Sequence, residues 1–197
     1  NGFVRVGALV NKLYLGNVIE NAKEISKEIK KAYKSGISIL VSHELSLTGY
    51  TCGDMFLQDK LISDSLEGLK YLLDQTKRLN IISIIGMPIL VNNQLYNCGV
   101  VISKGKILGI VPKTYIPNYK EFYEARQFSS WDMENDYISL GDDNVLIGNK
   151  MIFSCVDYSD LKIGVEICED MWVSNSPNID LCLNGATLML NLSASNE

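Results

Sequence analysis

The sequence predicts an α/β fold with a mixed β-sheet, and two patterns along the chain point to it. Up to about residue 86, short β-branched runs alternate with long amphipathic segments, which is typical of strand–helix–strand units in parallel sheets. Beyond it, turn signals separate consecutive apolar runs, which indicates antiparallel hairpins. With 197 residues, 47% of them hydrophobic and 21% charged, the chain has the size and composition of one globular domain.

The first strand–helix–strand unit is predicted within the first 41 residues. An apolar run at Val4–Val10 is the first strand. An amphipathic helix begins at Asn17, with Glu20 in the capping-box position, and its apolar residues recur at spacings of three and four. Gly36 stands where a helix C-terminal glycine belongs, and Ile37–Val41 is the second strand.

The remaining elements follow from the same signals. Turns are expected at Asn92-Asn93 and Lys104-Gly105, and Lys113–Asp143 reads as a long functional loop with one helical turn. The chain ends shortly after a strand that should be central in its sheet, which predicts a domain cut before its C-terminal end. The other predicted elements are a helix over Leu61–Leu79, strands at Ile81–Gly86, Met87–Val91, Tyr96–Ser103, Ile107–Val111, Met151–Val156, Leu161–Ile167 and Thr187–Leu192, and a short helix near Pro177–Leu183.

Charge and hydropathy argue against two classes of partner. Eighteen basic and twenty-three acidic residues give a net charge of −5, without a basic stripe that could neutralise phosphates, so we expect no nucleic acid. No apolar run approaches the roughly 18 residues of a membrane span, and the first residues lack the features of a signal peptide. We therefore expect no membrane association and a cytoplasmic location.

Cysteine and histidine usage narrows the chemistry. The five cysteines contain no C-x-x-C pair, so neither a disulfide framework nor a zinc site is expected, and no metal is assigned. His43 is the single histidine. Most Ser and Cys hydrolases use an imidazole as base, so a hydrolase of this sequence uses either His43 or a different group.

Three side chains with complementary chemistry follow predicted strands. Glu44, Lys113 and Cys168 each stand just past the C-terminal end of a strand, the edge where α/β proteins collect ligand-binding residues. Together they would provide a general base, an oxyanion stabiliser and a nucleophile. Taken singly, each residue also has a non-catalytic interpretation. A lone cysteine can be a small buried hydrophobic residue, and a lone glutamate or lysine in a loop can be a solvated charge.

Other assignments of these residues carry less weight. A Cys168–His43 dyad is the alternative to the trio, but His43 directly precedes Glu44 in an extended segment, so the two side chains should point to opposite sides. No dinucleotide fingerprint or phosphate-binding loop is present. The remaining cysteines are interpreted as structural: Cys52, Cys98, Cys155 and Cys182.

Three sequence blocks resemble the signature blocks of the nitrilase superfamily. They are His43–Asp54, Pro112–Glu124 and Gly164–Trp172, and within the superfamily they are most similar to the glutaminase domain of glutamine-dependent NAD synthetases. The resemblance covers essentially the whole chain. It departs at His43, where the family commonly has proline.

The resemblance implies a fold and a set of catalytic roles. The fold is a nitrilase-like four-layer α-β-β-α sandwich with mixed sheets, and the reaction is hydrolysis of the glutamine side-chain amide through a cysteine thioester. Cys168 matches the nucleophile, Glu44 the base and Lys113 the oxyanion stabiliser. Supporting roles fall to Glu124, which orients the lysine and the substrate, and to the backbone N–H of Glu169, which helps to hold the oxyanion.

The resemblance also implies a substrate pocket and partners. The positions that line the glutamine pocket in the family are Tyr50, Tyr119, Trp172 and, with a weaker match, Ser195. No cofactor is implied for this domain. In the family, ammonia passes to a synthetase domain of the same polypeptide, which uses ATP and Mg²⁺ to amidate nicotinic acid adenine dinucleotide. That domain is absent here, and the full-length enzyme would be a homo-oligomer.

Two alternatives of different kinds stay open. One is a stand-alone amidase or carbamoylase with the same trio, which the length of the parent gene would distinguish. The other is a binding module in which Cys168 is structural. A buried structural thiol reacts with iodoacetamide more slowly than free cysteine, and an activated nucleophile reacts faster.

Overall fold

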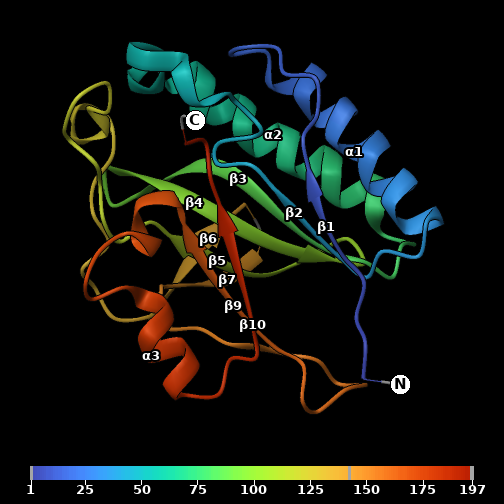
Figure 1. Ribbon diagram of the computed structural model, residues 1–197. Helices are drawn as coiled ribbons and strands as arrows, with labels where there is room; N and C mark the ends of the chain where they lie inside the picture. Colours follow the sequence, from blue (N-terminus) through green and yellow to red (C-terminus); the bar gives the residue numbers. More distant parts are fainter. Residues whose placement is uncertain (1, 142, 196–197) are drawn as a thin grey trace.

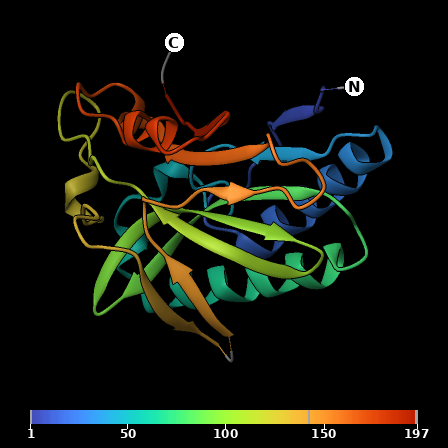
Figure 2. The ribbon, with the colours of Figure 1, turned by 90° about the horizontal axis from the view of Figure 1, so that it is seen from below.

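Two β-sheets stack face to face, with helices on the outer face of each. The computed structural model describes residues 2–141 and 143–195. Helices α1 (Val18–Lys34) and α2 (Asp59–Thr76) cover the larger sheet, and α3 (Pro177–Leu183) lies on the far side of the smaller one (Figure 1). Seen from below, the larger sheet lies between the smaller sheet and the two long helices (Figure 2). The described residues therefore form the expected α-β-β-α sandwich.

The larger sheet is mixed. Its strands lie in the order β1-β2-β3-β4-β5-β7-β6, with parallel pairing of β1, β2 and β3, antiparallel pairing from β3 to β5, and a parallel β5–β7 pair. The smaller sheet has the order β10-β9-β8, with β10 and β9 parallel. The strands are β1 (Val6–Leu9), β2 (Ile39–Ser42), β3 (Ile82–Val91), β4 (Gln94–Ser103), β5 (Lys106–Pro112), β6 (Asp136–Leu140), β7 (Asp143–Ile147), β8 (Phe153–Ser154), β9 (Lys162–Ile167) and β10 (Leu188–Leu192).

Local sequence signals account for the first helix and for the hairpins. The Asn17 side chain caps α1 by accepting a hydrogen bond from the backbone N–H of Glu20 at 3.4 Å. Asn92 and Asn93 both have positive φ, as do Lys104 and Gly105, the conformation that tight hairpin turns require. The predicted helix start and both hairpin turns are confirmed.

A layer of apolar side chains lies between the two sheets and stacks them. Its residues come from both sheets, and they bring the ends of β2, β5 and β9 into one region of the molecule. A second and larger apolar cluster joins α1 and α2 to the outer face of the large sheet. The inter-sheet layer contains Ile39, Ile84, Val101 and Val111 from the large sheet and Ile163, Val165, Ile167, Leu190 and Leu192 from the small one.

Several boundaries differ from the sequence predictions. The two predicted strands at 81–86 and 87–91 form the single strand β3, because the chain continues without a turn. Strands β6 and β7 form a hairpin, although Lys113–Asp143 was predicted as a loop with one helical turn; the turn η2 (Glu124–Arg126) lies within that predicted loop. The strand predicted at Met151–Val156 is shortened to β8. Strand β10 lies at the edge of the small sheet of the described residues, where a central position was expected.

Two further findings complete the description of the fold. The chain forms the 3₁₀ segments η1 (Tyr50–Leu57) and η3 (Cys168–Met171), which the sequence patterns did not predict. Within the described residues, none of the helices combines the length and apolar character that crossing a bilayer requires.

Gly86 in β3 has no room for a side chain, so we expect Gly86→Ala to be strongly destabilising. An added Cβ would lie 2.5 Å from the Leu45 nitrogen and 2.6 Å from the His43 oxygen, both backbone atoms that cannot move aside cheaply. We expect a loss of about 3 kcal/mol in the free energy of unfolding, measured by denaturant titration. The matched control is Gly99→Ala on the facing position of β4, where the nearest atoms are side-chain methyls at 3.3 Å. Equal stabilities of the two variants would contradict this packing argument.

Candidate active site

The three residues singled out by their position follow three strands of the sandwich. Glu44 lies two residues after β2, Lys113 directly after β5, and Cys168 directly after β9 at the start of η3. All three are buried, with exposed fractions of 1%, 0% and 6%. Because the sheets stack face to face, these strand ends converge from both layers.

Lys113 is the centre of a buried ion cluster. Its Nζ lies 2.6 Å from Glu44 Oε1 and 2.8 and 3.0 Å from the two carboxylate oxygens of Glu124. Burial by itself would lower the pKa of Lys113, but the two carboxylates outweigh it and the pKa is raised. The side chain is therefore an ammonium ion at neutral pH, held by two buried carboxylates.

The two oxygens of Glu44 have different surroundings. Oε1 accepts hydrogen bonds from Lys113 Nζ at 2.6 Å and from Asn97 Nδ2 at 2.7 Å, whereas Oε2 is buried and has no hydrogen-bond partner among the described residues. Burial raises the pKa of Glu44, Lys113 opposes that shift, and the charge of Glu124 adds to it. One oxygen is thus fixed and the other is free to accept a proton.

Cys168 has an unusual backbone conformation and lies in buried surroundings. Its φ of +46° is in the left-handed region that non-glycine residues rarely adopt, and its N–H donates to Asn191 Oδ1 at 3.2 Å. Burial is the main cause that raises the pKa of the thiol, and the charge of Glu44 raises it further. Lys113 and the hydroxyls of Ser193 and Ser195 lower it. The raised pKa keeps the group a thiol at neutral pH, so it needs a base.

The residues assigned by resemblance surround this cluster in different ways. The Tyr50 hydroxyl donates to Glu124 Oε1 at 2.6 Å, and the Tyr119 hydroxyl donates to Glu169 Oε2 at 2.8 Å. Ser195 Oγ lies 3.5 Å from Cys168 Sγ. Trp172 is 69% exposed, so its side chain is not part of the buried core.

His43 is not connected to the candidate nucleophile by a hydrogen bond in the described part of the chain. Its Nδ1 lies 3.1 Å from the backbone oxygen of Glu44, and the side chain is half-buried. The geometry favours the carboxylate of Glu44 over this imidazole as the base for Cys168.

Two buried polar residues of the site were missed by the sequence reasoning. Asp170 accepts hydrogen bonds from the backbone N–H groups of Thr114 at 3.1 Å, Tyr115 at 2.8 Å and Ile167 at 3.1 Å, so it joins the segment after Lys113 to the Cys168 turn. Burial raises its pKa to about 7, although those N–H groups lower it.

The other missed residue is Asn97. It is a fully buried amide in the middle of β4. The available signal was a lone asparagine inside an otherwise apolar run, because a buried polar side chain needs a partner.

The other cysteines form no disulfide among the described residues. Cys52 and Cys98 are buried, Cys155 is half-buried and Cys182 is exposed. No group of three or more His, Cys, Asp or Glu side chains in the described ranges is arranged to hold a metal ion.

Comparison with known proteins identifies the family. The sequence profile of the carbon-nitrogen hydrolase family matches residues 7–197. The chain belongs to the carbon-nitrogen hydrolase family. It is 36% identical over 195 residues to the glutamine-dependent NAD(+) synthetase of Mycobacterium bovis, covering 99% of this chain and 29% of that protein. It is 31% identical over 187 residues to the synthetase of Oryza sativa subsp. indica, covering 90% of this chain and 25% of that protein.

Solved structures agree with this assignment. The carbon-nitrogen hydrolase chain matches the crystal structure of a glutamine-dependent NAD(+) synthetase from Cytophaga hutchinsonii with a TM-score of 0.84 and 28% identity, over 98% of this chain and 30% of that one. An amidase from Nesterenkonia sp. matches with a TM-score of 0.72 and 14% identity, over 98% of this chain and 66% of that one, and shares the fold. The resemblance to glutamine-dependent NAD synthetases and the nitrilase-like fold are confirmed, and the chain spans less than a third of those relatives.

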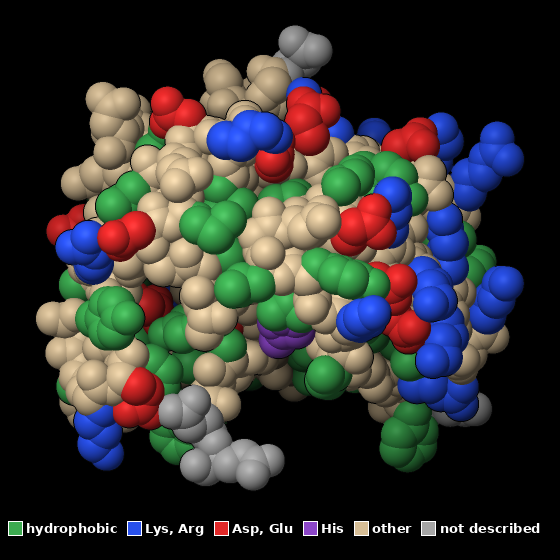
Figure 3. All heavy atoms as spheres, turned by 90° about the horizontal axis from the view of Figure 1, so that it is seen from above, with side chains coloured by type: hydrophobic (Ala, Val, Ile, Leu, Met, Phe, Trp, Pro, Cys, Tyr) green, Lys and Arg blue, Asp and Glu red, His purple; other side chains and the backbone are tan. Residues whose placement is uncertain are grey.

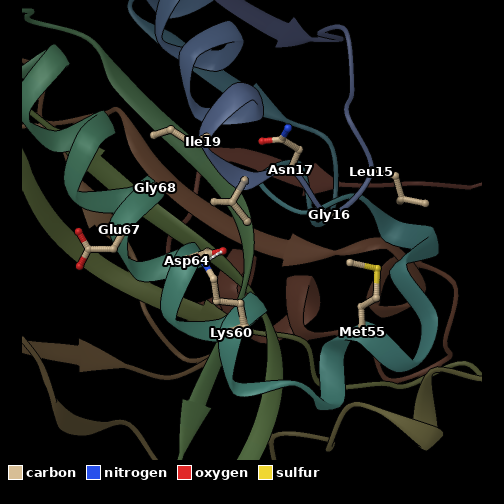
Figure 4. A pocket seen from close by; sticks show the side chains of 10 residues that line it. Leu15, Gly16, Asn17, Ile19, Met55, Lys60, Asp64, Glu67 and Gly68 are labelled. Carbon is tan, nitrogen blue, oxygen red and sulfur yellow. Dashed lines mark hydrogen bonds and ion pairs between the residues drawn. The ribbon is translucent and has the colours of Figure 1, made fainter.

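Some surface hollows of the described part of this hydrolase lie away from the ion cluster around Lys113. One, of about 530 Å³, lies between the start of α1, η1 and α2, with Ile19 and Met55 at its sides and the Lys60–Asp64 ion pair on its α2 side (Figure 4). None of its lining residues belongs to the ion cluster around Lys113.

Basic side chains gather along one edge of the face seen from above (Figure 3), and α1 carries a row of lysines there. A hollow beside α1 is lined by Lys23, Lys27, Lys30, Lys31 and Lys34. Three of these lysines pair with glutamates one turn earlier on the same helix, so much of the charge is compensated locally; the pairs are Lys23–Glu20, Lys27–Glu24 and Lys31–Glu28.

Proposed function

We propose that this carbon-nitrogen hydrolase hydrolyses the side-chain amide of glutamine through a thioester on Cys168 and delivers the ammonia to a synthetase domain. That domain would use ATP and Mg²⁺ to amidate nicotinic acid adenine dinucleotide to NAD. The observation that carries the proposal is the buried carboxylate of Glu44, with Oε1 bound by Lys113 and Oε2 free, near a buried thiol. The names and greater length of the relatives support the substrate and the partner domain.

The acylation step uses the three residues in defined roles. Glu44 accepts the thiol proton as the sulfur of Cys168 attacks the amide carbon, and the carbonyl oxygen becomes an oxyanion. The oxyanion is held by Lys113 and by the backbone N–H of Glu169. The C–N bond then breaks, Glu44 returns the proton to the leaving nitrogen, and ammonia departs, which leaves a thioester.

The deacylation step reverses these roles with water. Glu44 takes a proton from a water molecule that attacks the thioester carbon, the C–S bond breaks, and glutamate leaves as the sulfur regains a proton. Lys113 has three N–H donors. One bonds Glu44 Oε1 and one can be shared by the two oxygens of Glu124, so a third is available to the oxyanion in both steps.

The proposed glutamine pocket is formed by the aromatic and hydroxyl side chains around the cluster. Tyr50 is fixed by Glu124 and by an edge-to-face contact with the Phe122 ring, with ring centroids 6.3 Å apart. Tyr119 and Trp172 are 49% and 69% exposed, which suits residues at the entrance to the pocket rather than at its base.

A thioester-trapping experiment tests the proposed function. The full-length protein is mixed with glutamine, quenched in acid within the first turnover, and digested for mass spectrometry, while released ammonia is measured in parallel. We expect a glutamyl adduct on the peptide that contains Cys168. Hydrolysis of small aliphatic amides without hydrolysis of glutamine would instead support a stand-alone amidase and overturn the proposal.

Lys113→Met is expected to lower turnover more than glutamine binding. The ammonium charge is needed most when the oxyanion forms, and removal of one such donor costs about 2.7 to 4 kcal/mol of transition-state stabilisation. Lys113 also lowers the pKa of Cys168, so the midpoint pH for alkylation of Cys168 by iodoacetamide should rise in the variant. Steady-state kinetics and alkylation rates against pH measure the two effects.

Stability must be followed in the same variant, because two buried carboxylates lose their cation. Lys77→Met, which removes an exposed lysine paired with Asp74, is the matched control. A variant with unchanged kcat and a raised KM would contradict the role of Lys113 in the transition state.

A further inference from the structure

Lys113 is not the sole cause of the different surroundings of the two Glu44 oxygens in the described structure, because Asn97 contributes as well. Asn97 Nδ2 donates to Glu44 Oε1 at 2.7 Å and approaches Glu124 Oε2 at 3.5 Å. The backbone oxygen of Asn97 also accepts from the Lys113 N–H at 2.8 Å. One residue in the middle of β4 therefore contacts all three members of the buried ion cluster.

The orientation of the Asn97 amide follows from the charges around it. Its side chain faces two carboxylates, so the NH₂ end must point toward them, since a carbonyl oxygen there would be repelled. The residue is fully buried, and its Oδ1 has no hydrogen-bond partner among the described residues. Burying a polar atom without a hydrogen-bond partner destabilises the fold. The presence of an asparagine at this strand position therefore calls for a functional explanation.

We propose that Asn97 is a positioning residue that fixes the rotation of the Glu44 carboxylate, so that Oε2 stays unpaired and available to the Cys168 thiol. The inference rests on the proposed function of Glu44 as base. With Lys113 as the only donor, the carboxylate can turn and place either oxygen, or both, on the ammonium. With Asn97 and Lys113 both on Oε1, the second oxygen is kept free.

The same contact affects the titration of the base. The hydrogen bond from Asn97 favours the carboxylate form and lowers the pKa of Glu44 against the effect of burial. Loss of that bond therefore raises the pKa of Glu44. The base is active only above its pKa, so the acid limb of the pH–rate profile should move to higher pH.

The test is a double-mutant cycle in the full-length protein. Asn97→Leu removes the donor at similar volume, and Asn97→Ser provides a second variant in case leucine disturbs the fold. In either variant we expect kcat/KM for glutamine to fall roughly ten- to hundredfold, with the acid limb of its pH profile shifted upward. In a Glu44→Gln background the same substitutions should have little further effect, because Asn97 acts through Glu44.

The matched control is Cys98→Ala, the next residue of β4, which faces the helix-side apolar cluster on the opposite face of the strand. It should leave the pH profile unchanged. A fall in kcat/KM that is the same in the Glu44→Gln background, or an unshifted acid limb, would overturn the positioning role. If Cys168→Ala still hydrolysed glutamine, the proposed function itself would fail, and that outcome is distinct from either result for Asn97.

Discussion

Cys168→Ala is expected to abolish glutamine-dependent activity in the full-length protein while ammonia-dependent NAD synthesis persists. In the proposed mechanism the Cys168 thiol carries the covalent intermediate, and without that thiol no thioester can form. We expect glutamine hydrolysis to fall by about 10⁴-fold or more, because removal of a nucleophile disables the whole catalytic unit. Ammonia supplied from solution bypasses this step. Ammonia release and NAD formation from either nitrogen source measure the difference.

The matched control for this variant is Cys182→Ala, which removes an exposed free thiol on α3. It should retain both activities. Loss of the ammonia-dependent reaction in Cys168→Ala with the fold intact would contradict the division of labour between the two domains. Glutamine hydrolysis at the wild-type rate would show that Cys168 is structural, as in the binding-module alternative.

The parts of the fold that could be predicted from sequence are those fixed by local interactions. The Asn17 cap, the apolar stripe of α1 and the two tight hairpin turns are decided by residues a few positions apart. The β6–β7 hairpin was missed because most of its residues are exposed or half-buried, so it lacks the apolar alternation of a strand with one face in the core. The edge position of β10 depends on which strands pair across the sheet, and no local signal contains that information.

The candidate site also contains residues that the sequence could indicate and contacts that it could not. Glu44, Lys113 and Cys168 could be found from their positions at strand ends, because α/β proteins collect ligand-binding residues there. That the ends of β2 and β5 meet the end of β9 follows from the stacking of the two sheets, which the sequence patterns did not indicate. Glu124 begins the short turn η2 and does not follow a predicted strand, so only the resemblance to a known family pointed to it. The contact between Lys113 and both carboxylates is made by residues up to 69 positions apart, at distances that only the folded chain defines.

The approach of Asn97 to Glu44 likewise spans 53 positions. Its side chain could be suspected from burial in an apolar strand, but its partner could not be named. The exposed position of Trp172 was equally beyond the sequence pattern, and the resemblance to a known family gave this residue only as part of the glutamine pocket.

Glu44→Gln is expected to lower acyl-enzyme formation by about a hundredfold to ten-thousandfold, the range typical of a lost general base. Glutamine has nearly the same shape, and its Oε1 can still accept from Lys113 and Asn97, so the fold should be retained. What is lost is the free oxygen Oε2, which becomes an NH₂ group that cannot accept the thiol proton. Rapid-quench measurement of the first turnover with glutamine gives the acylation rate.

In Glu44→Gln the rate of Cys168 alkylation should not fall with the rate of glutamine turnover. This difference distinguishes the loss of a base from a general disturbance of the fold. The charge of Glu44 raises the pKa of Cys168, so its removal lowers that pKa and increases the thiolate fraction at a given pH. Iodoacetamide should then alkylate Cys168 at least as fast in Glu44→Gln as in the wild type, although glutamine is turned over far more slowly. Glu134→Gln, an exposed carboxylate paired with Lys150, should change neither rate. If the burst of ammonia from glutamine matched the wild type in Glu44→Gln, the base would have to be another group, and His43 would be the next to test.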